Sequence, residues 1–438
     1  MSQSLLDEAA ARRNVNYLAG LDFIISLGFG LIMPMFPLYT SLLEGGDTDV
    51  GLEIGILFSS FVFTRAVMAT PFGNLSDRLG RKRIILAGSF LYAFLAVLFT
   101  VPDSWLGLVF VRGLQGVASA MVWPVSEALV IDSSPVKMRG ASIGKIVMAA
   151  NLGMVVGPFI GAALFSMAQN VLGLSLMDSY KFPFYFTALL SLGGAVLVWA
   201  NVTDAIAPSR AKSKMSIRSL LHPEGMDRQG ARNLRILYAN ALMEGFAFAS
   251  VGPLLALFLV LEYPDLAQDS ISTIIGVAMG VGALAAFPSG RLSDKVGRKS
   301  IFVVSGYIAF AGVVLIPFAW TLAILIAFMA MRSFAWQVSS PALRALQADT
   351  VPENVRGRLI GTLESMSNLG SMIGAPLGGV MLDHFYDVDL GLGHVLDGSA
   401  IPFILAGGIG MFTISLVMVY VKERVASASV PAEPEVIP

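Results

Sequence analysis

Long apolar stretches alternate with short polar segments along almost the whole chain. A helix needs about 20 predominantly apolar residues to cross the hydrocarbon layer of a bilayer. The pattern predicts twelve membrane-spanning helices, near residues 17–41, 51–73, 83–101, 105–127, 141–168, 182–200, 234–261, 271–290, 300–317, 320–343, 358–382 and 401–421. We therefore expect an all-α integral membrane protein.

The polar segments divide the chain into two similar parts. The longest of them, residues 201–233, is basic, contains two prolines and lies between the sixth and seventh predicted spans. It predicts a cytoplasmic linker between an N-terminal six-helix bundle (1–200) and a C-terminal six-helix bundle (234–422). Residues 423–438 have the composition of a disordered tail. The polar N-terminus lacks a cleavage pattern, so we expect it to lead directly into the first span.

The composition is that of a protein whose surface faces lipid. Of 438 residues, 55% are hydrophobic and 13% charged, and the mean hydropathy is +0.74, whereas average soluble proteins have about 25% charged residues. The lack of cysteine excludes disulfides and cysteine-bound metals. The sequence has no phosphate-binding loop, histidine cluster or nucleophile–base arrangement, so we expect no ATP-driven pumping, metal, cofactor or enzymatic activity.

Basic side chains concentrate on alternate connections between the predicted spans. One side holds the basic residues of the linker together with Arg12, Arg13, Arg78, Arg81, Lys82, Arg83, Lys137, Arg139, Arg291, Lys295, Arg298, Lys299, Arg356, Arg358, Lys422 and Arg424. The other side carries carboxylates and, as its exception, Lys181. Because cytoplasmic loops are rich in Lys and Arg, we expect both termini to be cytoplasmic and the protein to lie in the plasma (cell inner) membrane.

Two charged segments repeat one pattern: GNLSDRLGRKR at 73–83 and GRLSDKVGRKS at 290–300. The same offset, close to half the chain, relates further pairs: Pro71 and Pro288, Pro124 and Pro341, Asp132 and Asp349, Pro135 and Pro352, Arg139 and Arg356, Gly140 and Gly357, Gly144 and Gly361, Gly153 and Gly370, Gly157 and Gly374, and Gly161 and Gly378. A half-length offset predicts two parallel, pseudo-symmetric six-helix units with the functional site where they meet, near the membrane midplane.

The first charged segment is predicted to form the short loop after the second span. Gly73 and Gly80 would allow close approach and a tight turn. Asp77 would pair with Arg81 or cap a neighbouring helix. A role in membrane topology alone would explain the cations, but not the repeated spacing of Gly, Asp and Arg.

These residues carry a resemblance to the major facilitator superfamily, which extends over essentially the whole chain and is strongest to the twelve-span drug–proton antiporter branch. The superfamily's loop motif is matched by Gly73, Leu75, Asp77, Arg78, Gly80, Arg81 and Lys82, and again by Gly290, Leu292, Asp294, Gly297, Arg298 and Lys299, with Lys295 in place of an arginine. The resemblance implies that both copies form a conformational latch that stabilises the outward-facing state.

Ionisable residues at mid-bilayer cost at least about 2.5–3.5 kcal/mol and are functional candidates. Arg112, with Gln115 and Gly116, resembles the superfamily's fourth-helix motif, whose arginine is associated with proton transfer. A buried guanidinium keeps its proton, so Arg112 would act by stabilising the charged form of a nearby carboxylate. The alternative is a structural arginine bonded to backbone carbonyls.

Four carboxylates are candidates for proton coupling: Glu244, Asp22, Glu127 and Glu364. Glu244 is the first candidate because it lies deep in the seventh span. Asp22 lies about one turn from the cytoplasmic end of the first span, so a helix-end role is equally open. Glu127 and Asp132 could instead form structural pairs with cations at the cytoplasmic end, namely Lys137, Arg139 or Lys145.

Other polar and aromatic residues within the spans are candidates for the substrate cavity: Arg332, Trp336, Gln337, Gln115 and Arg65. The first three lie on one predicted helix, a combination that suits an anionic or aromatic substrate. Arg332 could equally pair with Glu244 or Glu364 across the two halves.

The segment GMVVGPFIGA at 153–162 resembles the superfamily's antiporter motif and departs from it at its last position. Gly153, Gly157 and Gly161 would form one smooth face along which two backbones can approach closely. Pro158 leaves a carbonyl unpaired and permits a bend. The resemblance implies an exporter that exchanges substrate for protons; general small-residue packing is the alternative.

The sequence therefore predicts a proton-coupled antiporter that exports small amphipathic, drug-like molecules by alternating access, with the proton gradient as its energy source. We expect a monomer whose partners are the lipid bilayer, a small-molecule substrate and protons, without nucleic acid. The alternative is a proton-coupled symporter or uniporter that imports a small organic anion or sugar. A non-transporting receptor is disfavoured, because no sizeable soluble domain is predicted.

Overall fold

The computed structural model describes residues 7–46, 49–135, 138–204, 228–350, 356–384, 388–389, 395–396 and 398–422, and for residues 286–295 and 356–358 it describes the backbone. In these residues the fold is helical apart from one antiparallel pair of strands, β1 (Val388–Asp389) and β2 (Val395–Leu396). Each predicted span overlaps one long helix, so the all-helical prediction is confirmed. The predicted tail and most of the predicted linker lie outside the described residues.

Twelve helices of the described chain are long: α1 (Glu8–Ile32), α3 (Gly51–Leu79), α4 (Arg81–Leu98), α5 (Trp105–Ser133), α6 (Arg139–Ser166), α7 (Leu176–Asn201), α9 (Arg228–Val251), α11 (Gln268–Val296), α12 (Arg298–Leu315), α13 (Leu322–Thr350), α14 (Arg356–His384) and α15 (Ile401–Tyr420). The bounds of α11, α12 and α13 are those of α3, α4 and α5 shifted by the offset of the sequence repeat. The repeat is therefore present in the secondary structure. α9 begins within the predicted linker, so that part of the linker is helical.

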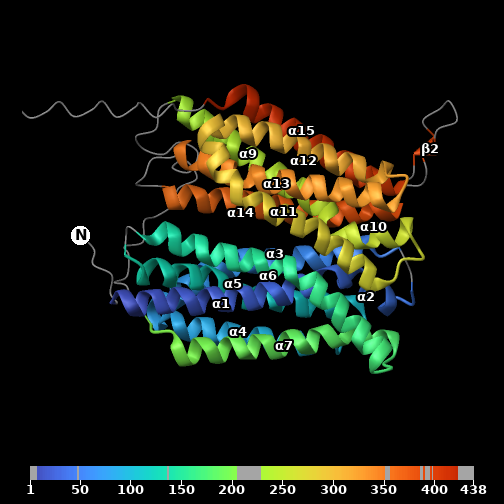
Figure 1. Ribbon diagram of the computed structural model, residues 1–438, viewed down its shortest axis with the longest axis horizontal. Helices are drawn as coiled ribbons and strands as arrows, with labels where there is room; N and C mark the ends of the chain where they lie inside the picture. The colour runs from blue at the N-terminus through green and yellow to red at the C-terminus, as the bar shows by residue number, and fades with distance from the viewer. Residues whose placement is uncertain are drawn as a thin grey trace, which may run out of the picture.

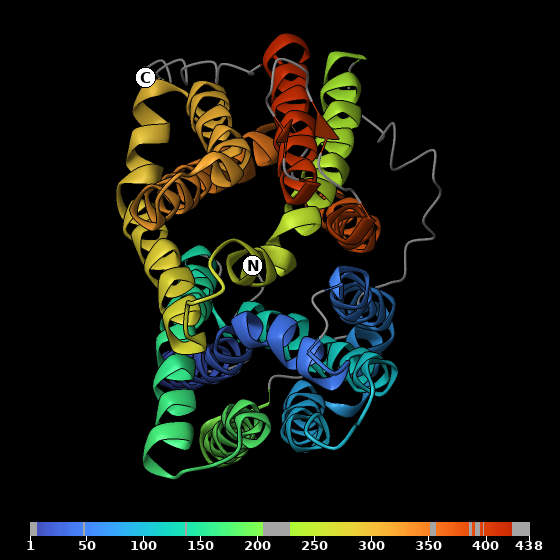
Figure 2. The same ribbon diagram turned by 90° about the vertical axis from the view of Figure 1, so that its right-hand side faces the viewer.

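The helices form two bundles, α1–α7 and α9–α15, that lie side by side (Figures 1 and 2). In the first bundle α1 packs against α6 and α7, α3 against α5, and α4 against α5 and α7. In the second, α9 packs against α14 and α15, α11 against α13, and α12 against α13 and α15. The bundles meet where α3 packs against α14 and α6 against α11.

The first helix of each half is interrupted at a proline. The 3-10 turn η1 (Met33–Met35) separates α1 from α2 (Phe36–Leu43), and η4 (Gly252–Leu254) separates α9 from α10 (Leu255–Glu262). Pro34 and Pro253 lie in these turns, and proline cannot donate the backbone hydrogen bond that a continuous helix needs. Both interruptions face the centre of the molecule, where a cavity lies between the halves.

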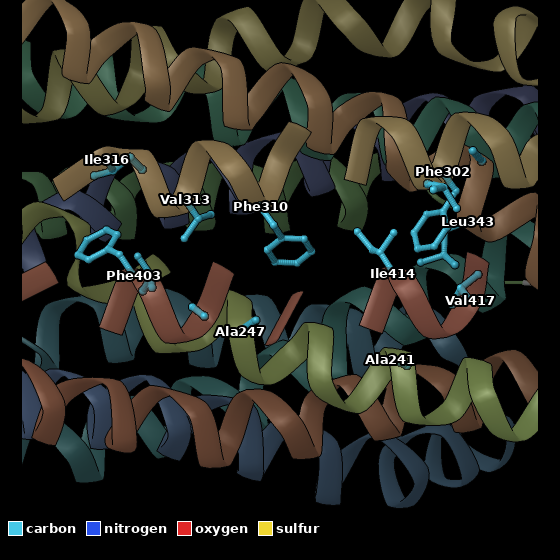
Figure 3. Close-up of a cluster of buried hydrophobic side chains, with 14 of the residues drawn as sticks. Ala241, Ala247, Phe302, Phe310, Val313, Ile316, Leu343, Phe403, Ile414 and Val417 are labelled. Atoms are coloured by element: carbon cyan, nitrogen blue, oxygen red, sulfur yellow. The ribbon is translucent and has the colours of Figure 1, made fainter. Parts of the chain in front are cut away.

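Each half buries its own apolar core. Figure 3 shows part of the C-terminal core, where Phe310 and Val313 of α12 lie between the helices with Phe403 and Ile414 of α15. Large apolar side chains also cover the outside of the protein, an arrangement that suits lipid rather than water. Ten helical segments of the described chain are long and apolar enough to cross a membrane; α4, which begins with three consecutive basic residues, and α14 are not among them.

Each half ties its first helix to the chain that follows its last helix. Asn14 donates through Nδ2 to the Thr203 carbonyl (2.8 Å) and accepts through Oδ1 from the Thr203 N–H (2.9 Å). Asn233 makes the same two bonds with Lys422, at 2.9 and 3.3 Å. Both asparagines are almost completely buried, so these bonds close the same end of both bundles.

Candidate functional site

The predicted loop at 73–83 is wrong, because α3 continues to Leu79 and α4 begins at Arg81. Gly80 alone joins them, with a left-handed φ of 96°, a conformation that glycine adopts without strain. Gly297 joins α11 to α12 in the same way, with φ 104°. A Cβ on Gly73 would meet no atom within 4 Å, so Gly73 is not required for close approach.

Charged side chains around the first turn form one pair that the sequence suggested and one that it did not. The Arg81 guanidinium lies 3.2 Å from an Asp77 carboxylate oxygen, as predicted, and 2.6 Å from Asp132. In the second half Arg298 pairs with Asp349, which is the equivalent of Asp132. Arg78 is exposed, and the side chains at positions 290 and 294 (Gly290 and Asp294) lie outside the described residues.

Two of the three cations suggested as partners of Glu127 and Asp132 bind elsewhere. Lys145 donates to Asn16 Oδ1 (2.6 Å), and Arg139 donates to the Ser134 carbonyl (3.4 Å). Lys137 lies outside the described residues. Asp132 pairs with Arg81, from the helix that precedes its own.

The halves are joined at the end of the bundle where α3 begins. We call this the Gly51 end, and the end with the α3–α4 turn the Gly80 end. The backbone N–H groups of Gly51 and Leu52 each donate to the Asp383 carboxylate of α14, at 2.8 Å. A small apolar cluster closes over the same end, formed by Val50, Ile54, Leu254, Leu257 and Leu382.

Further contacts between the halves lie toward the same end. The Ser59 hydroxyl donates to the Met372 carbonyl (2.8 Å), and the Tyr180 hydroxyl donates to Gln268 Oε1 (3.2 Å). A Cβ on Gly379 of α14 would collide with the backbone of Gly51, so the two helices touch directly. The Gly51 end is closed in this conformation.

A cavity of about 250 Å³ lies between the halves. The N-terminal half contributes Met33, Pro34, Asn151, Met154 and Val155, and the C-terminal half includes Phe248, Met279, Met329, Arg332, Trp336 and Gln337. Of the described residues that line it, Arg332 is the one ionisable side chain. Its guanidinium carbon lies 5.9 Å from the centre of the Phe248 ring, and it makes no hydrogen bond or ion pair with any described residue. The alternative in which Arg332 pairs with Glu244 or Glu364 is therefore not what the structure has.

A second cavity, of about 340 Å³, adjoins the first toward the Gly80 end and contains Glu244, Glu364 and Arg344. Phe248 and Trp336 line both cavities, with ring centres 5.6 Å apart, so this aromatic pair stands between them. Glu244 accepts a hydrogen bond from Asn240 Nδ2 (2.9 Å).

Charges of both signs face this second cavity. Arg344 acts electrostatically on Glu244 and, across the halves, on Glu127. Glu127, Arg344 and Glu364 are exposed. Exposed charges within membrane-spanning helices require water rather than lipid beside them. Water therefore reaches the second cavity from the Gly80 end.

Asp22 lies farther from the start of its helix than the sequence suggested. α1 begins at Glu8, so Asp22 follows fourteen residues of helix, and its side chain is 3% exposed. The prediction that it lies one turn from the helix end is wrong, because the helix extends beyond the apolar stretch. Its Oδ1 finds no hydrogen-bond partner among the described residues. Glu244 lies sixteen residues into α9. Asp22 follows Asn14 by eight residues and Glu244 follows Asn233 by eleven, and these asparagines close the same end of both bundles, so the two carboxyls differ in depth by less than one helical turn.

Arg112 is enclosed by aromatic rings. Its guanidinium lies 5.0 Å from the ring centre of Phe29, 4.4 Å from that of Phe36 and 4.6 Å from that of Phe61, and it donates to Gln115 Oε1 (2.9 Å). In the described chain no backbone carbonyl and no carboxylate binds it. Cation–π attraction replaces hydration here.

Two of the predicted cavity residues lie outside the central cavity. Gln115 is buried against Arg112, and Arg65 lies 4.7 Å over the ring of Trp123. Arg332, Trp336 and Gln337 line the cavity. The ionisable residue among the described lining of the central cavity therefore comes from α13, in the C-terminal half.

The glycine face of α6 packs as the sequence suggested. A Cβ on Gly157 would lie 2.6 Å from the Leu31 nitrogen and 2.7 Å from the Leu27 oxygen, so α6 and α1 meet backbone to backbone. Gly153 and Gly161 also meet the α1 backbone. In the second half Gly370, Gly374 and Gly378 bring α14 onto α9 in the same way.

Sequence reasoning missed three polar residues of the site: Arg344, Asn240 and Asp383. Arg344 occupies the position that the repeat makes equivalent to Glu127, so the repeat could have identified it as a charge facing the same space. Asn240 precedes Glu244 by four residues, a spacing that places two side chains next to each other on a helix, so the sequence could have predicted this contact. Asp383 joins the halves through backbone groups of α3, and no pattern in the sequence indicates that partner.

Two packed helical bundles, with a cavity between them that is closed at one end and reached by water from the other, define a membrane transporter. The family model described as Major Facilitator Superfamily matches residues 18–236 and again residues 237–437. The chain belongs to this superfamily. It is a multi-pass membrane transporter and not an enzyme.

Similar proteins agree with this assignment. An uncharacterized MFS-type transporter of Methanocaldococcus jannaschii is 27% identical over 395 residues, which cover 90% of this chain and 96% of that protein. The multidrug resistance protein MdtG of Proteus mirabilis is 27% identical over 371 residues, 81% of this chain and 86% of that protein. A crystal structure of a D-xylose–proton symporter has the same fold, with a TM-score of 0.74, 14% identity, and coverage of 94% of this chain and 98% of that one.

Proposed function

We propose that this protein is a proton-coupled antiporter that exports small amphipathic molecules by alternating access. The observation that carries the proposal is the pair of carboxyls, Asp22 and Glu244, set at similar depth in the first helix of each half. Uptake of one proton neutralises a carboxylate, which lowers the cost of enclosing it away from water when the halves change conformation. The export direction is supported by the likeness to proteins named for multidrug resistance and by the glycine–proline motif at 153–161.

In this proposal all twelve long helices cross the inner membrane, and the Gly80 end, with its basic residues, is cytoplasmic. The closed Gly51 end then makes this conformation inward-facing, ready to take substrate from the cytoplasm. Closing the Gly80 end would bring the two halves together over the charges of the second cavity. The turns at Gly80 and Gly297, with their Arg–Asp pairs, would then act as the latch.

Glu244 is well placed to couple the proton to the substrate. It faces the water-reached cavity, and Phe248, one helical turn further along α9, stands between that cavity and the central one. Gly245 lets α14 touch α9 directly beside it. Neutralising Glu244 removes its attraction to Arg344, so protonation would change how α9, α13 and α14 hold together. Asp22 would play the corresponding part in α1.

Proton flux measured in proteoliposomes tests the proposal. A gradient of a transported amphipathic compound should drive protons in the opposite direction, recorded by a trapped pH dye. Glu244→Gln should move compound without protons, whereas Glu8→Gln, an exposed control, should behave as wild type. Absence of proton movement in wild type, or full movement in Glu244→Gln, contradicts the proposal. Protons moving with the compound would identify the importing symporter instead.

A further inference from the structure

We infer that the central cavity binds an amphipathic organic anion, whose acidic group is held by Arg332 and whose apolar body lies against the surrounding methionines and aromatic rings. This inference rests on the proposed function only for the direction in which the anion is transported. Binding of the anion in the central cavity is the same claim for an exporter and for an importer. Its basis is the distribution of charge and apolar surface around one unpaired guanidinium.

Arg332 has no counter-charge of its own. It is the one ionisable residue among the described lining of the central cavity, and it makes no hydrogen bond or ion pair with any described residue. A guanidinium has five N–H donors that need acceptors, and leaving them unsatisfied in an apolar site is unfavourable. A carboxylate, sulfonate or phosphonate on a ligand would supply two acceptors in the geometry that a guanidinium prefers.

Arg112, the buried arginine of the N-terminal half, has surroundings that leave no room for a ligand. Three aromatic rings and Gln115 surround it, and the space beside it is about 30 Å³. Its guanidinium is therefore already enclosed by protein groups and no ligand group of useful size fits. Arg332 has the Phe248 ring on one side and about 250 Å³ of cavity next to it.

The rest of the lining suits an apolar, partly aromatic body. Met33, Met154, Met279 and Met329 bring flexible thioether side chains from both halves, and Phe248 and Trp336 bring ring faces. Methionine adapts to ligands of different shape, and its sulfur packs well on aromatic groups. Small-molecule cavities begin at roughly 300 Å³, so a cavity near that size fits a ligand of about two fused rings.

A cationic ligand would find no partner in the central cavity. No carboxylate is among its described lining residues, and the Arg332 charge would repel it. Glu244 lies in the adjoining cavity beyond the Phe248–Trp336 pair and already accepts a bond from Asn240. The charge arrangement therefore favours anionic over cationic ligands. Apolar contacts alone cannot distinguish ligands by the sign of their charge.

Three probes that share one naphthalene body test the inference: 2-naphthoate, 2-naphthylmethanol and 2-naphthylmethylammonium. Their dissociation constants are measured by calorimetry on the purified full chain in detergent, without a pH gradient. We expect naphthoate to bind wild type at least about ten-fold more tightly than the other two, because one charge-assisted hydrogen-bond pair favours it by that order.

Substitutions test whether Arg332 is the residue that causes the preference for naphthoate. Arg332→Met should bring the three dissociation constants within about two-fold of one another, since the apolar body keeps its contacts, and Arg332→Lys should retain part of the preference. Arg235→Met is the matched control: Arg235 donates to the Ala231 carbonyl of its own helix and does not line the cavity. It should keep the full preference for the anion.

Three outcomes overturn the inference: the ammonium or the alcohol binding wild type as tightly as naphthoate, no binding of any probe, or an anion preference that survives Arg332→Met. The comparison of the three probes on wild type needs no variant, so it decides even if Arg332→Met fails to fold. Because binding is measured at equilibrium, lost proton flux with the anion preference intact refutes the coupling proposal alone. A missing anion preference with normal flux refutes this inference alone.

Discussion

The N-terminal and C-terminal halves of this transporter share a scaffold and differ at its centre. The helices α3, α4 and α5 have the same lengths as α11, α12 and α13, and both halves turn at a left-handed glycine. At the centre the equivalent positions carry different side chains: Arg112 corresponds to Met329, Gln115 to Arg332, and Glu127 to Arg344. One half encloses its arginine in rings, and the other presents it to the cavity.

The difference indicates which parts of a duplicated bundle are free to change. Helix ends and backbone contacts depend on glycines and buried amides that hold neighbouring helices, so changing one of them disturbs the packing of its half. The Glu127 and Arg344 side chains are exposed rather than packed in the core of their own half. Equivalent positions of this kind can therefore carry opposite charges, as Glu127 and Arg344 do, without disturbing the scaffold.

The largest effect should come from filling the backbone contact that both halves share. Gly157→Val and Gly374→Val would each push a side chain into the backbone of the facing helix, Leu31 and Phe246 respectively. Backbone cannot move aside as a side chain does, so we expect each variant to lose about 3 kcal/mol of stability, the upper end of the usual cost of overpacking. The yield of monodisperse protein after detergent extraction measures it.

The controls lie on the same two helices. Gly144 and Gly361 are equivalent positions where an added Cβ meets no atom within 4 Å, so Gly144→Val and Gly361→Val should extract as wild type does. If only one of the Gly157 and Gly374 variants were disturbed, the halves would not share the contact in the way described here.

The next effect should come from the amides that close each bundle. Asn14→Ala and Asn233→Ala each remove a buried side chain that bonds both backbone groups of one residue, Thr203 or Lys422. Buried groups left without partners cost about 1–3 kcal/mol each, so we expect similar losses of about 2 kcal/mol. Thermal unfolding followed by intrinsic fluorescence measures them, and a loss in one half only would break the equivalence.

The smallest effect should separate the two Arg–Asp pairs. The Arg81 and Asp132 side chains are each 12% exposed, whereas Arg298 and Asp349 are 34% and 39% exposed. Breaking a shielded pair leaves a charge poorly solvated, but exposed pairs contribute little. We expect Asp132→Asn to cost about 1–2 kcal/mol, moderated by the remaining Asp77, and Asp349→Asn less than about 0.5 kcal/mol.

Melting temperatures of the two Asp→Asn variants, with Glu8→Gln as an exposed ion-pair control, give this comparison. Equal losses would mean that exposure does not distinguish the two halves. A larger loss for Asp349→Asn would reverse the expected order and contradict the physical reason given for it.

The sequence was sufficient for the helices and their repeat, because lipid imposes a long apolar stretch on every span and duplication preserves spacing. Local pairs such as Asp77–Arg81 and glycine faces such as that of α6 follow from helical periodicity. The surroundings of Arg112 could not be predicted: its three rings come from α1, α2 and α3, and only tertiary packing brings them together. The distance of Asp22 from the start of α1 was missed because polar residues extend this helix beyond its apolar stretch.

The most direct test is a pair of distances between the halves, one at each end. The natural chain has no cysteine, so spin labels can be placed at the exposed positions Leu79 and Val296 at the Gly80 end, and Leu172 and Trp320 at the Gly51 end. Between alkaline and acidic pH, or on adding naphthoate, alternating access predicts that one distance shortens while the other lengthens. Two distances that stay constant under every condition would contradict it.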